Sequence, residues 1–235
     1  MRRTMTCLIA TLLLGSTAAG ASPEAAIKDT HRPAADVARD ADRKPAEMLE
    51  FAHVGPGKKV VDFLPGGNYF TRLFAIAVKP GGSVIAVVPA AAAARDKTGA
   101  IVADPAYGNV TIASGLGDPV MTGLDVVWTA QNYHDLHNTD APVVAGANKA
   151  AFNALKPGGY YVIVDHAALP GATDATKKLH RIDPAVVKAE VTAAGFVFDG
   201  ESKVLANPAD DHSKPVFDPS IRGHTDQFAY RFRKP

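Results

Sequence analysis

The sequence predicts an α/β protein with a Rossmann-like, doubly wound and mostly parallel sheet of seven strands that ends in an antiparallel hairpin. Short apolar runs rich in β-branched residues alternate with helical patterns, and short Gly/Pro turns join them. Only a loop separates the last two runs, so we expect them to pair with each other in antiparallel fashion. The 235 residues, 47% of them hydrophobic, suit one domain with a substantial core.

Each predicted strand is a short apolar run that is followed by a turn signal. The runs are residues 59–63, 83–88, 109–114, 124–129, 160–164, 196–204 and 227–232. Runs of this kind, with little polar alternation, are typical of strands buried on both faces of a parallel sheet.

Helical patterns precede and separate these strands, over residues 34–52 and 68–78, from Asp140 to the turn that begins at Lys156, and from Asp183 to about Ala194. Lys79-Pro80-Gly81-Gly82 and Lys156-Pro157-Gly158-Gly159 end two of these helices, since Gly and Pro are typical of helix termini. We expect a break at Lys44-Pro45, because the residue before a proline avoids the α region.

The first 21 residues have the pattern of a signal peptide. Arg2 and Arg3 are followed by an apolar run, and Ala19-Gly20-Ala21 fits the small-x-small cleavage pattern. We therefore expect export to the periplasm or secretion; a retained anchor is the alternative, although the run is short for a bilayer span. We predict a linker over residues 22–33 and one domain over residues 34–235. Cys7 is the only cysteine, so we expect no disulfide after processing.

The formal net charge of the chain is +1, and the sequence contains no long cluster of Lys and Arg. A nucleic-acid or anionic membrane partner that is bound through a basic field is therefore not expected. A small-molecule substrate is the partner that the sequence favours.

Polar and glycine residues follow the first and fourth predicted strands, where a doubly wound sheet binds its ligand. Asp62 ends the first strand and is followed by Leu64, Pro65, Gly66 and Gly67. Glycines at this turn allow a close approach of the backbone to a ligand, and the N–H groups of the next helix favour a polar or anionic group. A strand-to-helix turn without any ligand is the structural alternative.

The segment Val60-Val61-Asp62-Phe63-Leu64-Pro65-Gly66-Gly67-Asn68-Tyr69 resembles the first motif of class I S-adenosylmethionine-dependent methyltransferases. Lys156-Pro157-Gly158-Gly159, followed by an apolar strand, resembles a later motif of the same group. From about residue 32 to 233 the chain is similar to a bacterial subgroup of predicted methyltransferases, many of which carry export signals. That similarity rests on Asp42-Arg43-Lys44-Pro45, Asn132-Tyr133-His134-Asp135, His180-Arg181-Ile182-Asp183, Asn207-Pro208-Ala209-Asp210-Asp211-His212 and Arg222-Gly223-His224-Thr225-Asp226-Gln227-Phe228.

The resemblance implies an enzyme that transfers the methyl group of S-adenosylmethionine to an unidentified small molecule. It implies that the methyl acceptor lies near Asn132, Tyr133 and His134, and that the adenine lies beyond Ser114. The cofactor-binding residues that we expect are Asp62, Leu64, Pro65, Gly66, Gly67, Tyr69, Pro89, Ser114 and Asn132. Arg43 and Lys44 lie where this fold often covers its cofactor; the alternative is that they are solvated charges.

The chain departs from the group at the end of the second strand. There the group usually has an acid that accepts hydrogen bonds from the ribose, whereas this sequence has Val88-Pro89-Ala90 with Asp96 as the nearest acid. Two hydrogen bonds to a charged acceptor would be lost, and the loss of each one weakens the binding free energy by about 1.5–3 kcal/mol. The alternative function is therefore a non-catalytic or accessory binding protein that kept the fold and lost the cofactor.

Two histidines at strand ends are candidate bases for a methyl acceptor that loses a proton. We expect His134 to act first in this role and His166, which follows Asp165, to be the second candidate, while Tyr133 orients the acceptor. For each histidine the alternative is an ordinary loop or packing residue.

Two groups of residues contain both acids and histidines. His134 and His137 flank Asp135, and His212 follows Asp210 and Asp211. Neither group has the spacing of an established zinc motif, so the sequence predicts no metal.

The loop over residues 207–226 is long for a hairpin connection. Long loops in compact domains are often lids, but a loop of this length also needs internal partners to be ordered. We expect Arg222, His224 and Asp226 to fasten the loop rather than to face the site.

Overall fold

The structure, a computed structural model, describes residues 22–93, 96–139 and 143–235. The predicted signal peptide and the predicted helix start at Asp140 lie outside these residues. Within the described ranges, no helix combines the length and the apolar character that a bilayer span requires.

A single mixed sheet has the strand order β3-β2-β1-β4-β5-β7-β6. Its strands are β1 (Lys59–Phe63), β2 (Ser83–Val87), β3 (Val110–Ala113), β4 (Leu124–Ala130), β5 (Leu155–His166), β6 (Val197–Ser202) and β7 (Gln227–Arg233). β1 to β5 pair in parallel, whereas β7 is antiparallel to both of its neighbours, β5 and β6. The predicted fold class is confirmed, and the final hairpin closes one edge with β7 inserted between β5 and β6.

The strand order reverses between β1 and β4. The chain leaves β1 for β2 and β3 on one side, and returns to β4 on the other side of β1. The carboxyl ends of β1 and β4 therefore diverge into connections on opposite sides, which leaves a crevice between them.

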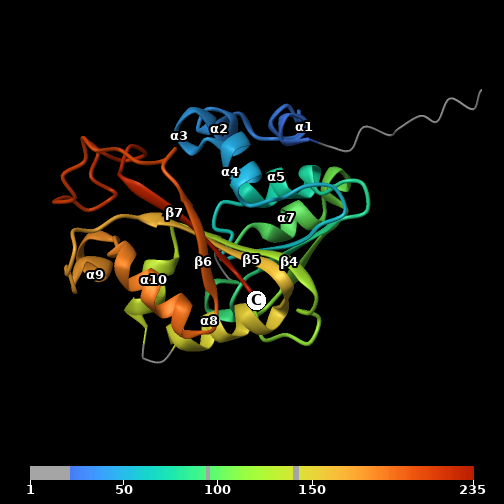
Figure 1. Cartoon of the computed structure of the whole chain (residues 1–235). Helices are drawn as coiled ribbons and strands as arrows, with labels where there is room; N and C mark the ends of the chain where they lie inside the picture. Colours follow the sequence, from blue (N-terminus) through green and yellow to red (C-terminus); the bar gives the residue numbers. More distant parts are fainter. Residues whose placement is uncertain (1–21, 94–95, 140–142) are drawn as a thin grey trace, which may run out of the picture.

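Two layers of helices cover the sheet, as Figure 1 shows for α4, α5 and α7 on one face and for α8 and α10 on the other. The first layer comprises α1 (Pro23–Ile27), α2 (Ala34–Val37), α3 (Asp40–Arg43), α4 (Pro45–Phe51), α5 (Tyr69–Ala77), α6 (Ala90–Ala93), α7 (Thr98–Val102) and the short 3-10 helix η1 (Pro105–Tyr107). The second comprises η2 (Tyr133–Asn138), also 3-10, and α8 (Val143–Ala154), α9 (Ala175–Leu179) and α10 (Pro184–Ala193).

Successive residues of β4 belong to opposite cores, because side chains alternate across a strand. Val126 and Trp128 pack with the α5 side, where the Trp128 ring lies 4.6 Å from that of Phe70. Val127 packs with the α8 and α10 side. The uninterrupted apolar run in the sequence reflects this burial on both faces.

Two predictions about local structure are wrong. Residues 22–33 were predicted as a linker, but Ala26 is fully buried in the α5 core, and Arg32 forms an ion pair with Asp40 at 2.5 Å. The strand predicted to begin at residue 160 begins at Leu155, because β5 pairs with Leu124 before a register irregularity that contains the Lys156–Gly159 turn.

The turn between α5 and β2 requires glycine at position 82. A Cβ atom there would lie 2.5 Å from the carbonyl oxygens of Lys58 and Val78 and from the Cβ of Val78. Because two of these neighbours are backbone atoms, they cannot rotate away, and α5 could no longer approach β2.

We expect Gly82→Ala to lower the free energy of unfolding by about 1–3 kcal/mol through overpacking. Gly146→Ala is the matched control, since this exposed position in α8 has open space and gains about 0.5–1 kcal/mol of helix propensity. Urea denaturation of both variants measures the difference. Equal midpoints for the two variants would contradict the packing argument.

Candidate functional site

The turn between β1 and α5 contains three residues with left-handed backbones. The φ angles are 62° at Leu64, 56° at Gly66 and 62° at Asn68. Glycine adopts this region freely and asparagine more easily than most residues, but leucine is strained there. Strain of this kind concentrates at functional sites and persists only where neighbouring groups hold it.

Hydrogen bonds hold this turn on both sides. The backbone N–H of Leu64 donates to the carbonyl of Val87 at 3.1 Å, and Asn132 Nδ2 donates to the carbonyl of Leu64 at 2.8 Å. At the other end of the turn, the Oδ1 of Asn68 accepts from the hydroxyl of Thr98 at 2.8 Å. The turn is therefore fixed to β2, to the β4 connection and to α7.

Two adjoining cavities lie at the crevice between β1 and β4, and we call them together the switch-point cleft. They share the lining residues Leu64, Pro65, Gly66 and Asn132. The first cavity, of about 290 Å³, is also lined by Val88, Pro89, Ala92 and Asp96. The second, of about 250 Å³, is also lined by Asp36, Arg39, Arg43, Asp62, Gly67, Tyr69, Phe70, Ala130 and Gln131. One half of the cleft is mainly apolar and the other is charged.

Asp62 supplies a buried carboxyl group to the charged half. Burial raises its pKa to about 7, which outweighs the hydrogen bond from Thr71 and the charge of Arg43, both of which lower it. The Thr71 hydroxyl donates to Oδ2 at 2.6 Å, and no side chain of the described residues donates a hydrogen bond to Oδ1. Asp62 is therefore poised between its two protonation states near neutral pH.

Arg43 faces Asp62 across the same cavity. Its Nη2 donates to Gln131 Oε1 at 2.5 Å, and its guanidinium lies 4.6 Å from the centre of the Tyr69 ring. Burial and the charge of Arg39 lower its pKa to about 10, so it stays cationic at neutral pH. Its Nε is buried without a hydrogen-bond partner among the described residues. A buried donor left unsatisfied in this way costs about 1–3 kcal/mol.

The structure brings eight of the nine predicted cofactor-binding residues to the cleft. The predicted residues that line one or both cavities are Leu64, Pro65, Gly66, Pro89, Asn132, Asp62, Gly67 and Tyr69. Ser114 does not line either cavity and is exposed to solvent. Arg43 lines the cleft, in agreement with a covering role, whereas Lys44 does not.

Sequence reasoning missed Asp36 and Arg39, which also line the charged half. Together with Arg43 they are spaced three and four residues apart. In a helical segment that spacing places all three on one face. This spacing was the feature of the sequence from which Asp36 and Arg39 could have been predicted.

The three predicted catalytic residues lie beside the cleft rather than in its lining. Tyr133 is fully buried, and its hydroxyl contacts Glu190 Oε2 at 3.0 Å and Asn148 Nδ2 at 2.8 Å, in the layer of α8 and α10. Its role in orienting an acceptor therefore has no geometric support. His166 Nδ1 contacts the Thr225 hydroxyl at 2.7 Å, and burial lowers its pKa to about 4.

His134 is buried and has protein groups at both ring nitrogens. Nδ1 lies 2.8 Å from Asp165 Oδ1, and Nε2 lies 3.3 Å from Nδ1 of His180. Burial lowers the pKa of His134, but the hydrogen bond and the charge of Asp165 outweigh it and raise the pKa above its ordinary value. As a base it remains a prediction, because neither nitrogen is directed at the cleft.

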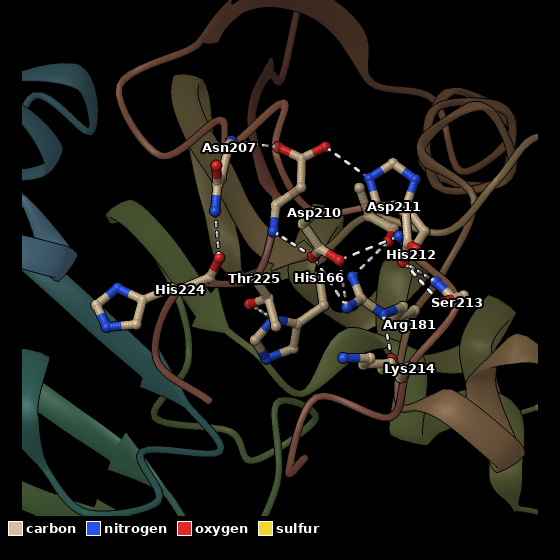
Figure 2. Close-up of polar contacts among 12 residues, drawn as sticks. His166, Arg181, Asn207, Asp210, Asp211, His212, Ser213, Lys214, His224 and Thr225 are labelled. Atoms are coloured by element: carbon tan, nitrogen blue, oxygen red, sulfur yellow. Dashed lines mark hydrogen bonds and ion pairs between the residues drawn. The ribbon is translucent and has the colours of Figure 1, made fainter. Parts of the chain in front are cut away.

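The long loop between β6 and β7 is fastened to the body of the protein by the buried Arg181 (Figure 2). Its guanidinium donates to Asp210 Oδ1 at 3.1 Å and to the carbonyls of Ala167 and Lys214 at 3.1 and 3.0 Å. Asp210 also accepts from the backbone N–H groups of Asp226 and His212.

Of the three residues expected to fasten the loop, two do so. Asp226 accepts from the backbone of Asn207. The His224 carbonyl accepts from the Asn207 side chain, as Figure 2 also shows. Arg222 is exposed, and its side chain forms no hydrogen bond or ion pair with the described residues.

The fold resembles that of many solved methyltransferases. A SAM-dependent methyltransferase from Aquifex aeolicus superposes with a TM-score of 0.61 at 15% identity, over 91% of this chain and 99% of that one. The N-methyltransferase NodS from Bradyrhizobium japonicum superposes with a TM-score of 0.59 at 16% identity, over 83% and 97%. Fibrillarin from Aeropyrum pernix, solved with natively bound S-adenosyl-L-methionine, has a TM-score of 0.50 at 15% identity, over 83% and 76%.

No family model and no curated protein matches the sequence. The likenesses and the strand order together show that the chain has the fold of class I SAM-dependent methyltransferases. At identities this low, structural similarity establishes the fold alone. The activity has to be argued from the residues of the cleft.

We expect Arg181→Met to destabilise the protein by about 3–5 kcal/mol, because it leaves the buried carboxylate of Asp210 without its cation. Arg222→Met, at an exposed position, should change the free energy of unfolding by less than about 0.5 kcal/mol. Thermal unfolding and limited proteolysis of the 203–226 loop measure both effects. A loop in Arg181→Met that resists protease as well as the parent loop does would show that Arg181 is not its anchor.

Proposed function

We propose that the protein binds S-adenosylmethionine in the switch-point cleft and transfers its methyl group to a small molecule. The observation that carries this proposal is the division of the cleft into an apolar half and a half with an opposed acid and arginine. S-adenosylmethionine has the same division, since an adenosine is joined through a cationic sulfur to an amino acid with an ammonium and a carboxylate.

The charged half suits the amino-acid end of this cofactor. The cationic guanidinium of Arg43 is a donor for the carboxylate, and Asp62 is an acceptor for the ammonium. Charge-assisted hydrogen bonds of this kind are about twice as strong as neutral ones. The tight turn at Gly66 and Gly67 leaves its backbone accessible to the same end of the ligand.

The apolar half suits the adenosine. Val88, Pro89 and Ala92 offer contacts to the base, and Asp96 lines the same cavity. Asp96 Oδ1 accepts from the backbone N–H of Thr98 at 2.6 Å, which orients the carboxylate. We assign to Asp96 the recognition of the ribose hydroxyls, in place of the acid that Pro89 replaces at the end of β2.

When bound, S-adenosylmethionine supplies a methyl group that is already activated by its sulfonium. The residues of this chain contribute mainly by positioning, and well-oriented reactants can gain about 7–11 kcal/mol from it. Asn132 lies at the junction of the two cavities with Nδ2 donating to Leu64 and Ala130, so its Oδ1 can orient a ligand group. His134 and His166 remain predictions as bases.

Isothermal titration of the processed protein with S-adenosylmethionine, and with its demethylated product, tests the proposal. We expect Arg43→Met and Asp96→Asn each to weaken binding by about 10- to 100-fold, the equivalent of one lost charged hydrogen bond. Arg222→Met and Asp211→Asn, which change the same residue types at exposed positions, should bind as the parent does.

Two results of this titration would overturn parts of the proposal. The absence of heat for both ligands at millimolar concentration would exclude the cofactor. Tight binding of S-adenosylmethionine, with no demethylated product formed in the presence of any of a panel of small-molecule acceptors, would support the accessory binding protein instead.

The protonation of Asp62 predicts how the affinity for the cofactor depends on pH. The cationic cofactor binds the carboxylate better than the neutral acid, so a proton leaves Asp62 on binding when the pH is below its pKa of about 7. Affinity should therefore rise by up to about tenfold per pH unit towards pH 7 and level off above it.

Titrations in two buffers of different ionisation enthalpy measure the released proton directly. Asp62→Asn should bind more weakly and should lose both the pH slope and the buffer dependence. A slope that persists unchanged in Asp62→Asn would assign the titration to another group.

A further inference from the structure

Three side chains that could ligate a metal meet at the start of η2 and the end of α9. They are His134, Asp135 and His180, and their ligand atoms lie within 4.8 Å of one another. His134 Nε2 is 3.3 Å from His180 Nδ1 and 3.4 Å from Asp135 Oδ1, and the last two atoms are 3.6 Å apart. We propose that these three side chains bind a divalent transition-metal ion, with Zn²⁺ as the best match.

The three distances form nearly an equilateral triangle of the size that a tetrahedral metal requires. Zinc lies about 2.0–2.2 Å from nitrogen and oxygen ligands, which places the ligands of a tetrahedral site about 3.3–3.6 Å apart. The observed triangle of 3.3, 3.4 and 3.6 Å is one face of such a tetrahedron.

A hydrogen-bonded cluster without metal explains the same distances less well. An N–H donor normally lies about 2.7–3.2 Å from an oxygen acceptor, and a charged N–H about 2.7–2.9 Å from a carboxylate. The contact of His134 Nε2 with Asp135 Oδ1, at 3.4 Å, is longer than both ranges. In contrast, the contact of the other ring nitrogen, Nδ1, with Asp165 is an ordinary 2.8 Å.

Asp165 provides the second layer of such a site. Its Oδ1 is 2.8 Å from His134 Nδ1 and accepts from the backbone N–H of His166, while its Oδ2 accepts from the backbone N–H of His134. A carboxylate that accepts from Nδ1–H leaves Nε2 with a lone pair, directed at Asp135 and His180. Metal-binding histidines almost always have a partner of this kind, which fixes the tautomer and the ring orientation.

The local charge favours a cation. Asp165 is fully buried, and within the described parts of the chain neither it nor Asp135 has a lysine or arginine within ion-pair distance. Asp165 and Asp135 thus place two carboxylates beside the two imidazoles, an arrangement that favours a bound divalent cation. Soft monovalent and hard oxygen-seeking ions fit the two imidazoles less well.

The cluster is accessible from solvent on one side. The side chain of His134 is 3% exposed, whereas those of Asp135 and His180 are 49% and 34% exposed. An ion can therefore enter past the outer two ligands and keep a fourth position for water or another ligand. Three protein ligands with one open position is the arrangement of catalytic rather than structural zinc.

This inference is independent of the proposed function. The cofactor cleft and the cluster use different side chains, although His134 follows the cleft residue Asn132 by two positions. Metal binding can therefore be measured in the absence of S-adenosylmethionine, and failure of either proposal leaves the other in place.

The test uses the processed chain without an affinity tag, first treated with chelator and dialysed. Calorimetry with Zn²⁺ should give one equivalent bound, and Co²⁺ should give the intense visible absorption of a tetrahedral site. We expect His180→Asn and Asp135→Asn to weaken binding by about 100-fold or more, and Asp165→Asn by about 10- to 100-fold. His224→Asn, at a histidine whose side chain is 68% exposed, is the control and should bind as the parent does.

Circular dichroism and thermal unfolding of the metal-free variants establish that each one is folded. The two partly exposed ligands supply independent variants, so a misfolded His134 or Asp165 variant does not decide the result. No stoichiometric binding of Zn²⁺ or Co²⁺ would overturn the proposal, as would unchanged binding in both His180→Asn and Asp135→Asn.

Discussion

One side-chain hydrogen bond connects the parts of the molecule on which its chemistry depends. Asn132 Nδ2 donates to the carbonyl of Leu64, and thereby joins the end of β4 to the end of β1 where the strand order reverses. Leu64 has a left-handed backbone that would otherwise be unfavourable by about 1–2 kcal/mol. Without this bond the turn could relax, and both cavities of the switch-point cleft would lose a common wall.

Burial determines the electrostatics of the cleft more than any ion pair does. Asp62 and Arg43 have opposite charges in one cavity, yet burial shifts each pKa towards the neutral form, to about 7 and about 10. Their hydrogen bonds to Thr71 and Gln131 leave part of each group unsatisfied. A site with this arrangement is unfavourable when empty and is stabilised by a ligand that carries both charges.

The sequence predicted the central strands well because they are buried on both faces. The β-branched run of β1 has the same bounds in the sequence and in the structure, Lys59–Phe63. The start of β5 was wrong because the Lys156–Gly159 turn is a register irregularity inside a pairing that continues beyond it, and one-dimensional turn signals cannot distinguish these cases. The linker was wrong because alanine has little pattern of its own, although Ala26 is fully buried.

The sequence likewise predicted some residues of the candidate site and missed others. Residues on the first turn were predictable, since a strand followed by glycines fixes where a ligand approaches. The position of Asp96 in the apolar cavity was not, because Asp96 is seven positions from Pro89 and only the folded chain brings both to one cavity. Likewise, His180 is 46 positions from His134, and only the path of the chain from β5 through α9 brings them together.

The environment of His134 bears on two different roles, that of a general base and that of a metal ligand. A general base needs a free nitrogen directed at the substrate, whereas a metal ligand needs a nitrogen directed at other ligands and a fixed tautomer. His134 has its Nδ1 held by the buried Asp165 and its Nε2 directed at Asp135 and His180, away from the cleft lining. This geometry fits the second set of conditions, whereas the role of His134 as a base remains a prediction. In the methyl transfer proposed for the cleft, positioning falls to Asn132, Asp62 and Arg43, and a His134 that binds a metal is not available to take a proton from the acceptor.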